Sequence, residues 1–147
     1  MDLRTGFEIE EPKVMVPWGI SETELQELLV ETPPRRVTQG YLTLPVKVLG
    51  GLQCQLGFHF RRSGRLSELE FFRRAYPDQR ASFEEFQRYF ENAFGAPTRS
   101  TDGNEGFPSF EWRLPGATIH HFVFDRFGPE EHVRVRHAAQ SGGSGDR

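Results

Sequence analysis

The sequence predicts an α+β fold in which two amphipathic helices pack on an antiparallel β-sheet. Two segments combine a helix-capping pattern with apolar residues at helical spacing, and most other segments alternate apolar and polar residues with period two. Short turns join the alternating segments, and strands joined in this way pair antiparallel. With 147 residues, 36% of them hydrophobic, the chain can bury one core without disulfides or structural metals.

Each predicted helix starts at a serine. Ser21 is followed by Glu24, and Ser82 is followed by Glu85, which is the spacing of a capping box. After the first start, leucines form a stripe of about three turns that a proline pair ends. After the second, phenylalanines recur at helical spacing until Gly95, which favours a left-handed C-cap.

Period-two alternation predicts the strands. They are expected at 7–16, 37–49, 53–60, 69–71, 110–114, 119–125 and 133–135. The polar, glycine-containing range 99–106 is expected to be a mobile surface loop.

The order of these elements suggests an internal repeat. A helix followed by three strands occurs twice, so the single α+β domain at 1–138 divides into halves at 17–75 and 80–138. Residue identity between the halves is low, and a coincidence of element order is the alternative. The Gly/Ser-rich range 139–147 is expected to be a flexible tail.

The net charge of −3 conceals two segments of opposite sign: residues 1–34 hold two basic and eight acidic side chains, and residues 35–81 hold nine basic and three acidic ones. A protein partner is expected to bind an acidic face on the first helix, formed by Glu22, Glu24, Glu27 and Glu31. A second candidate surface is a basic hairpin with Arg61, Arg62, Arg65, Arg73 and Arg74. The simpler alternative for the acidic face is a helix surface that is merely solvated, and for the basic hairpin it is ion pairing within the molecule. Phosphate binding by the arginines is a less favoured alternative.

Catalytic motifs are absent from the sequence: it contains no G-x-x-x-x-G-K-S/T, G-x-G-x-x-G, H-E-x-x-H, EF-hand or G-x-S-x-G pattern. No catalytic residue and no cofactor is therefore expected.

Cys54 alternates with glutamines and is interpreted as a buried thiol. The remaining alternative is an enzyme or metal site on the last two strands, formed by His121, Asp125 and His137; adjacent His120 and His121 must point to opposite faces of their strand.

A family resemblance supports a binding function. The run from Pro17 to Ser21, the Phe-Gly-x-Pro ending at Pro97, and Trp112 followed by Ile119 to His121 resemble small bacterial α+β proteins, including immunity proteins of polymorphic toxin systems. The helix-then-meander order also resembles the tandem modules of β-lactamase-inhibitor-like and outer-membrane assembly lipoprotein folds. The immunity resemblance implies a non-catalytic inhibitor that occupies a toxin's active site.

We therefore expect a non-catalytic protein-binding module, with a toxin as one candidate partner. The first twenty residues lack an apolar signal segment and no long apolar run follows, so a cytoplasmic location without membrane contact is expected.

Overall fold

The computed structural model describes residues 1–103, 106–125 and 129–138. These residues form ten strands and two helices. In chain order they are β1 (Gly6–Ile9), β2 (Val14–Pro17), α1 (Glu22–Leu28), β3 (Arg35–Thr38), β4 (Tyr41–Val48), β5 (Leu52–Phe60), β6 (Leu66–Phe72), α2 (Gln79–Phe94), β7 (Arg99–Thr101), β8 (Ser109–Leu114), β9 (Ala117–Asp125) and β10 (Pro129–His137).

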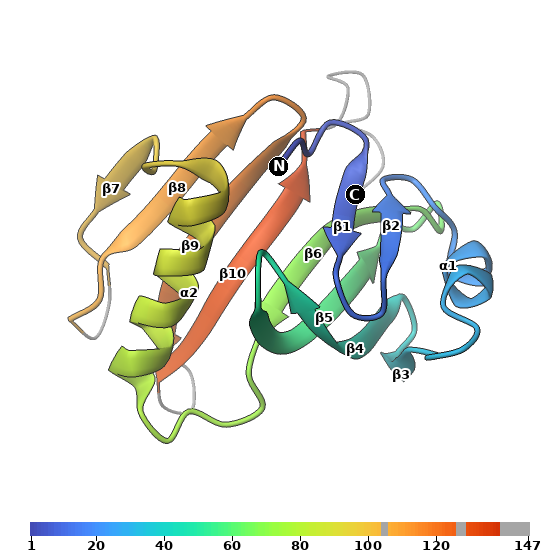
Figure 1. The fold of residues 1–147 in the computed structure, drawn as a ribbon, viewed down its shortest axis with the longest axis horizontal. Coiled ribbons are helices and arrows are strands. Elements are labelled where there is room, and N and C mark those ends of the chain that lie inside the picture. Colours follow the sequence, from blue (N-terminus) through green and yellow to red (C-terminus); the bar gives the residue numbers. More distant parts are fainter. Residues whose placement is uncertain (104–105, 126–128, 139–147) are drawn as a thin grey trace.

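The predicted fold class is wrong, because the fold is mostly β, with 49% strand and 18% helix. Eight strands form one antiparallel sheet in the order β3-β4-β5-β6-β10-β9-β8-β7, and β1 and β2 pair as a separate hairpin (Figure 1). Only α2, with 16 residues, is long enough to cross several strands; α1 has seven residues and ends at Leu29, so its leucine stripe spans about two turns. The range 7–16, predicted as one strand, turns back on itself and forms the β1–β2 hairpin.

The prediction of three strands in each half is also wrong. The sheet consists of two four-stranded meanders, β3–β6 and β7–β10, which join where β6 pairs with β10. The additional strands, β3 and β7, are the short exposed strands at the two edges of the sheet. Strand β7 begins at Arg99, inside the range that was predicted to be a loop. The predicted tail at 139–147 lies outside the described residues.

The two helix starts differ in how well the sequence predicts them. The Ser21 capping box is confirmed: the Glu24 amide donates to the Ser21 hydroxyl at 3.1 Å, and the Ser21 amide donates to the Glu24 carboxylate at 2.9 Å. The predicted Ser82 cap is wrong, because α2 begins three residues earlier, at Gln79, with Asp78 accepting from the Ala81 amide at 3.0 Å. Asp is as good an N-cap as Ser.

The covering layer on one face of the sheet is built differently over each meander. Helix α2 lies over the β7–β10 meander, and the β1–β2 hairpin lies over the β3–β6 meander (Figure 1). Phe71 of β6 contacts both layers: its ring centroid is 5.1 Å from that of Phe7 in β1 and 5.6 Å from that of Phe90 in α2. Beneath α2, the Trp112 indole donates to the Gly95 carbonyl at 2.9 Å. Gly95 is the C-cap of α2 and has the positive φ, 85°, that favours glycine, but its ψ of −170° lies outside the predicted left-handed helical region. The main core therefore lies between the sheet and this mixed layer, and a second, smaller cluster contains Phe83, Phe107 and Val123.

Within the described part of the chain, neither helix has the length and apolar character that crossing a bilayer requires.

Candidate functional site

The opposite face of the sheet has no described helix or strand packed over it, and we call it the open face. Side chains alternate along each strand, so the neighbours of buried Val133 and Val135 in β10, which are His132, Arg134 and Arg136, point to the open face. Several apolar rings lie on this face as well. Phe124 is 43% exposed, which is unusual for a phenylalanine in a strand.

Aromatic and histidine rings stack on one another across the open face, and we call this set the ring ladder. Tyr41 of β4 stacks on His59 of β5 with ring centroids 4.4 Å apart. Phe122 of β9 lies between two imidazoles, 4.4 Å from His120 and 5.3 Å from His132. The ladder therefore spans five neighbouring strands from β4 to β9.

Glu70 of β6 joins the two parts of the ring ladder. Its carboxylate lies 2.9 Å from Nε2 of His59 and 2.8 Å from Nδ1 of His132, and its side chain is only 9% exposed. Burial alone raises the pKa of Glu70, but the hydrogen bonds from His132 and His59 and the charge of Arg134 outweigh it and hold the pKa well below its ordinary value. Glu70 is therefore a permanent anion at neutral pH, and burial with the Glu70 charge raises the pKa of Tyr41 to about 12.

Charges on the open face are arranged by depth. Glu68 of β6 is 14% exposed and lies 2.9 Å from Nη1 of Arg134. In contrast, the side chains of Arg113 and Arg136 are each 63% exposed. Glu68 and Glu70 thus lie low on the sheet, whereas the guanidinium groups of Arg113 and Arg136 and the carboxylate of Glu130, which is 40% exposed, extend into solvent.

The predicted metal site does not assemble from the histidines that the structure describes. His121 is fully buried beneath α2, whereas His137 stacks on Trp18 with ring centroids 5.2 Å apart. His121 pairs with Val133, four residues before His137 on β10, so the two imidazoles are separated along the sheet. The side chain of Asp125 lies outside the described residues. Among the described side chains, no group of three or more His, Cys, Asp or Glu residues has the arrangement of a metal site.

His121 instead belongs to a buried polar cluster on the covered face. Its Nδ1 lies 2.7 Å from Oε1 of Gln87, and its Nε2 contacts the carboxylate of Glu131, which is 1% exposed. The Gln87 amide donates to Glu91, which fixes Oε1 toward the imidazole. Both ring nitrogens of His121 therefore have an oxygen partner inside the molecule.

This buried cluster has the residue types of a nucleophile and its base but not their arrangement. The Ser82 hydroxyl donates to Glu131 at 2.8 Å rather than to His121, and it accepts from Arg73 at 2.9 Å. Phe83 stacks on the His121 ring at 4.1 Å and seals it from solvent. Ser82 also lines a surface hollow of about 510 Å³ together with Arg73 and Glu85, while the hydrogen bonds of the cluster tie α2 to the sheet.

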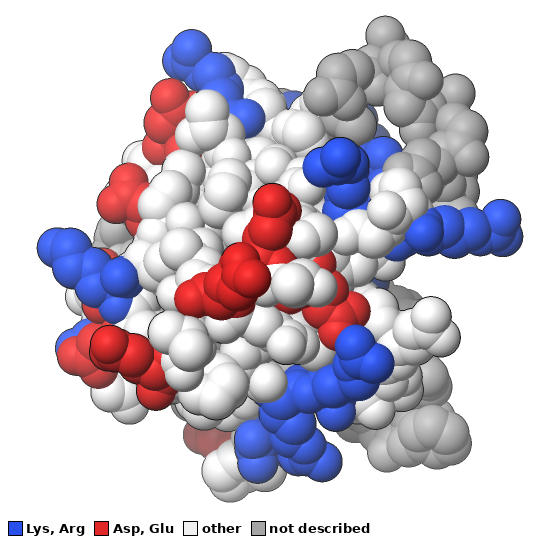
Figure 2. All heavy atoms as spheres, turned by 90° about the vertical axis from the view of Figure 1, so that its right-hand side faces the viewer, with Lys and Arg blue, Asp and Glu red and all other residues white. Residues whose placement is uncertain are grey.

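The predicted acidic face is partly used within the molecule. Glu24 caps α1, and its hydrogen bonds to Ser21 lower its pKa; Glu22 pairs with Arg36. Glu27 and Glu31 are exposed. On the side of the molecule that Figure 2 shows, acidic side chains gather near the centre with basic side chains around them, so neither sign dominates this surface.

The predicted basic hairpin is divided by the fold. Arg61, Arg62 and Arg65 lie around the turn before β6, whereas Arg73 and Arg74 follow its other end. Arg73 is engaged: its guanidinium pairs with Glu85 and lies 4.8 Å from the centroid of the Phe86 ring. These five arginines therefore do not form one basic surface.

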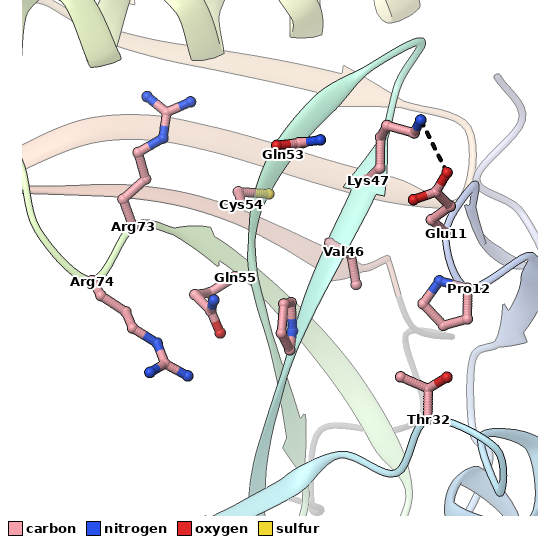
Figure 3. Close-up of a pocket in the computed structure, with 11 residues that line it drawn as sticks. Glu11, Pro12, Thr32, Val46, Lys47, Gln53, Cys54, Gln55, Arg73 and Arg74 are labelled. Atoms are coloured by element: carbon pink, nitrogen blue, oxygen red, sulfur yellow. Dashed lines mark ion pairs between the residues drawn. The ribbon is translucent and has the colours of Figure 1, made fainter.

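A hollow of about 710 Å³ lies beside Arg73 (Figure 3). Arg73 and Arg74 lie on one side of it, and the Glu11–Lys47 ion pair, at 3.1 Å, lies on the other. Cys54 lies between them. Burial raises the pKa of the Cys54 thiol to about 12, so it stays protonated at neutral pH and is no nucleophile.

No protein-family model, curated protein or solved structure matches this chain. The open face is therefore judged on its geometry and chemistry.

Proposed function

We propose that this protein is a non-catalytic, cytoplasmic protein-binding module that contacts an acidic surface of its partner with the open face of the sheet. The observation that carries the proposal is the uncovered ring ladder with exposed guanidinium groups around it. Aromatic residues and arginine are the residue types enriched at the centres of protein interfaces. Because Glu68 and Glu70 lie deep and are already paired, a partner meets the arginines first, which favours an acidic complement.

The stacking of the rings favours a protein partner over a nucleic acid. Single-stranded nucleic acids bind sheets by stacking bases on free aromatic faces. Here the faces of Phe122 are turned toward His120 and His132, and Tyr41 is stacked on His59. The rings thus present mainly their edges to solvent, which suits side-chain packing better than base stacking.

A non-catalytic role is supported by the state of the reactive groups. Ser82, His121 and Glu131 are buried and satisfied by one another, and Cys54 is a neutral thiol. The resemblance to immunity proteins suggests inhibition of a toxin as the specific form of binding, in which the open face covers part of the toxin's active site.

The test is affinity capture from the native host with the full chain and two matched variants. Phe124→Ser removes a 43% exposed apolar side chain from the open face, and Met15→Ser removes a 39% exposed one from the covering hairpin. We expect wild type and Met15→Ser to retain a stoichiometric protein partner, and Phe124→Ser to lose about tenfold in affinity for it, since an interface anchor contributes roughly 1–2 kcal/mol or more.

Three results contradict the proposed function. They are equal retention of the partner by Phe124→Ser, loss of the partner by Met15→Ser alone, and recovery of nucleic acid in place of a protein. Both variants change exposed positions, so thermal melts close to wild type serve as the folding control.

A further inference from the structure

A small hollow lies on the open face where β8, β9 and β10 run side by side, and its volume is about 340 Å³. Thr118 and His120 of β9 form its floor together with Phe122, and Arg134 and Arg136 of β10 form one side. Glu111 of β8 lies on the other side. The rings of His120 and Phe122 line this hollow without filling it.

The strand register places cationic and hydroxyl groups in one row across the hollow. Thr118 pairs with Arg113 on β8 and with Arg136 on β10, so two guanidinium groups flank its hydroxyl. The next row on the same face is Glu111, His120 and Arg134. Neighbouring residues in such a row stand about 5 Å apart, which brings all these side chains within reach of one small anion.

The arginines of the hollow keep unused donors. Arg136 makes one contact with Glu68, at 3.4 Å, and is 63% exposed, so most of its five N–H groups remain available. Arg134 donates to Glu68 at 2.9 Å through Nη1, while its buried Nε has no hydrogen-bond partner among the described residues. A buried N–H without an acceptor is costly, and an incoming oxygen would relieve it.

The charge of the hollow fits a monoanion. Arg134 and Arg136 both pair with Glu68, and the nearby Arg113 pairs with Glu111, so three guanidinium groups face two carboxylates and one net positive charge remains. Burial lowers the pKa of His120, although the charge of Glu111 acts in the opposite direction. A carboxylate matches one positive charge, whereas a phosphate dianion exceeds it and meets Glu111 as well.

We infer that this hollow is a carboxylate subsite, in which Arg136 and Arg134 bind the side chain of an Asp or Glu of the partner protein beside Thr118. This inference rests on the proposed function and names the chemistry of its central contact. Arginine suits the role because its guanidinium plane can hold both carboxylate oxygens.

The experiment is an NMR titration of the ¹⁵N-labelled full chain with a capped aspartate, N-acetyl-aspartate methylamide, at pH 7. Capped asparagine is the uncharged control, and inorganic phosphate is the third arm. We expect saturable shifts in the millimolar range at the amides of Thr118, His120, Arg134 and Arg136 with capped aspartate, and no saturable shift with capped asparagine. Arg136→Gln should weaken binding about fivefold or more, whereas Arg62→Gln, which removes an exposed arginine outside the hollow, should bind as wild type does.

The carboxylate subsite is overturned by any of three outcomes: capped asparagine binds equally well, Arg136→Gln binds as wild type does, or phosphate binds more tightly than capped aspartate. The spectrum of Arg136→Gln shows independently that the variant is folded. The titration needs no partner protein, so it tests the carboxylate subsite independently of the proposed protein-binding function. A silent titration with a partner still lost in Phe124→Ser removes only the subsite, and a positive titration with a partner indifferent to Phe124→Ser removes only the proposed function.

Discussion

Two histidine–glutamate clusters lie on opposite faces of the same strand. Glu131 and His132 are neighbours on β10, yet Glu131 contacts His121 beneath α2, while His132 contacts Glu70 on the open face. The covered cluster is closed to solvent, with His121 at 0% and Glu131 at 1% exposure. In the open cluster, the His59 side chain keeps 32% of its surface in solvent.

The comparison shows that location, not residue type, decides what such a pair does. In the covered cluster the contacts are closed to solvent, and they stabilise the packing of α2 on the sheet. In the open cluster the same chemistry fixes the orientation of rings that remain accessible to solvent. Three changes, taken from the largest expected effect to the smallest, sharpen this contrast.

Glu131→Ala should cause the largest loss of stability. It leaves Nε2 of the buried His121 without its partner and removes the acceptor of the Ser82 hydroxyl, so we expect a loss of about 3–5 kcal/mol in the free energy of unfolding, measured by urea denaturation. The double variant His121→Phe with Glu131→Leu is the control. It removes both members of the pair together, and it should lose markedly less than the single variant. A single variant that loses under about 1 kcal/mol would show that the covered cluster does not hold α2 on the sheet.

Glu70→Gln should have an intermediate effect on stability. The change removes the charge that His59, His132 and Arg134 share, and the site is partly screened by solvent, so the expected loss is about 1–2 kcal/mol. Glu130→Gln is the matched control on the same face, since Glu130 is 40% exposed and lies 3.7 Å from His132; it should change stability by less than about 0.5 kcal/mol. Equal effects of the two variants would mean that Glu70 does not hold the ring ladder together.

The smallest expected effect is the pH dependence of the stability that Glu70 contributes to the folded state. The folded pKa of Glu70 lies below the ordinary value of 4.5, so the folded state binds fewer protons than the unfolded state there. The stability difference between wild type and Glu70→Gln should therefore be complete above 4.5 and decline progressively as the pH falls below it. Urea midpoints for both proteins across the acidic range measure this difference. A difference that stays constant down to the lowest pH would contradict a depressed pKa.

Much of the local structure could be predicted from the sequence. Alternation identified β5, β6 and β8, because one face of each strand is mainly apolar and the other mainly polar; β9 was also identified, although Phe122 and Phe124 lie on its open face. The Ser82 cap failed because Asp78 stands four residues upstream and competes for the same role, while the Ser82 hydroxyl is taken by Glu131. The β1–β2 hairpin was missed because both its strands are short and apolar, so their alternation reads as one strand.

The candidate site could not be predicted, because it depends on strand order. Alternation correctly separated His120 from His121, but nothing local indicates that β6 lies beside β10. Glu70 and His132 are 62 residues apart in the chain, and only this pairing brings them together. The position of Gln87 in a helix likewise did not indicate that its side chain would contact His121 in the core.

The junction between β6 and β10 has a consequence for how the molecule reaches its native state. Each of these strands is the last of its meander, so the seam that unites the halves forms from contacts of long sequence separation, the kind that forms slowly. A nascent chain can complete the β3–β6 meander well before β10 has left the ribosome. Both histidine–glutamate clusters contain residues of β10 and therefore assemble together, in the step that closes the seam. The open face and the covered cluster that supports it thus form in the same step of folding.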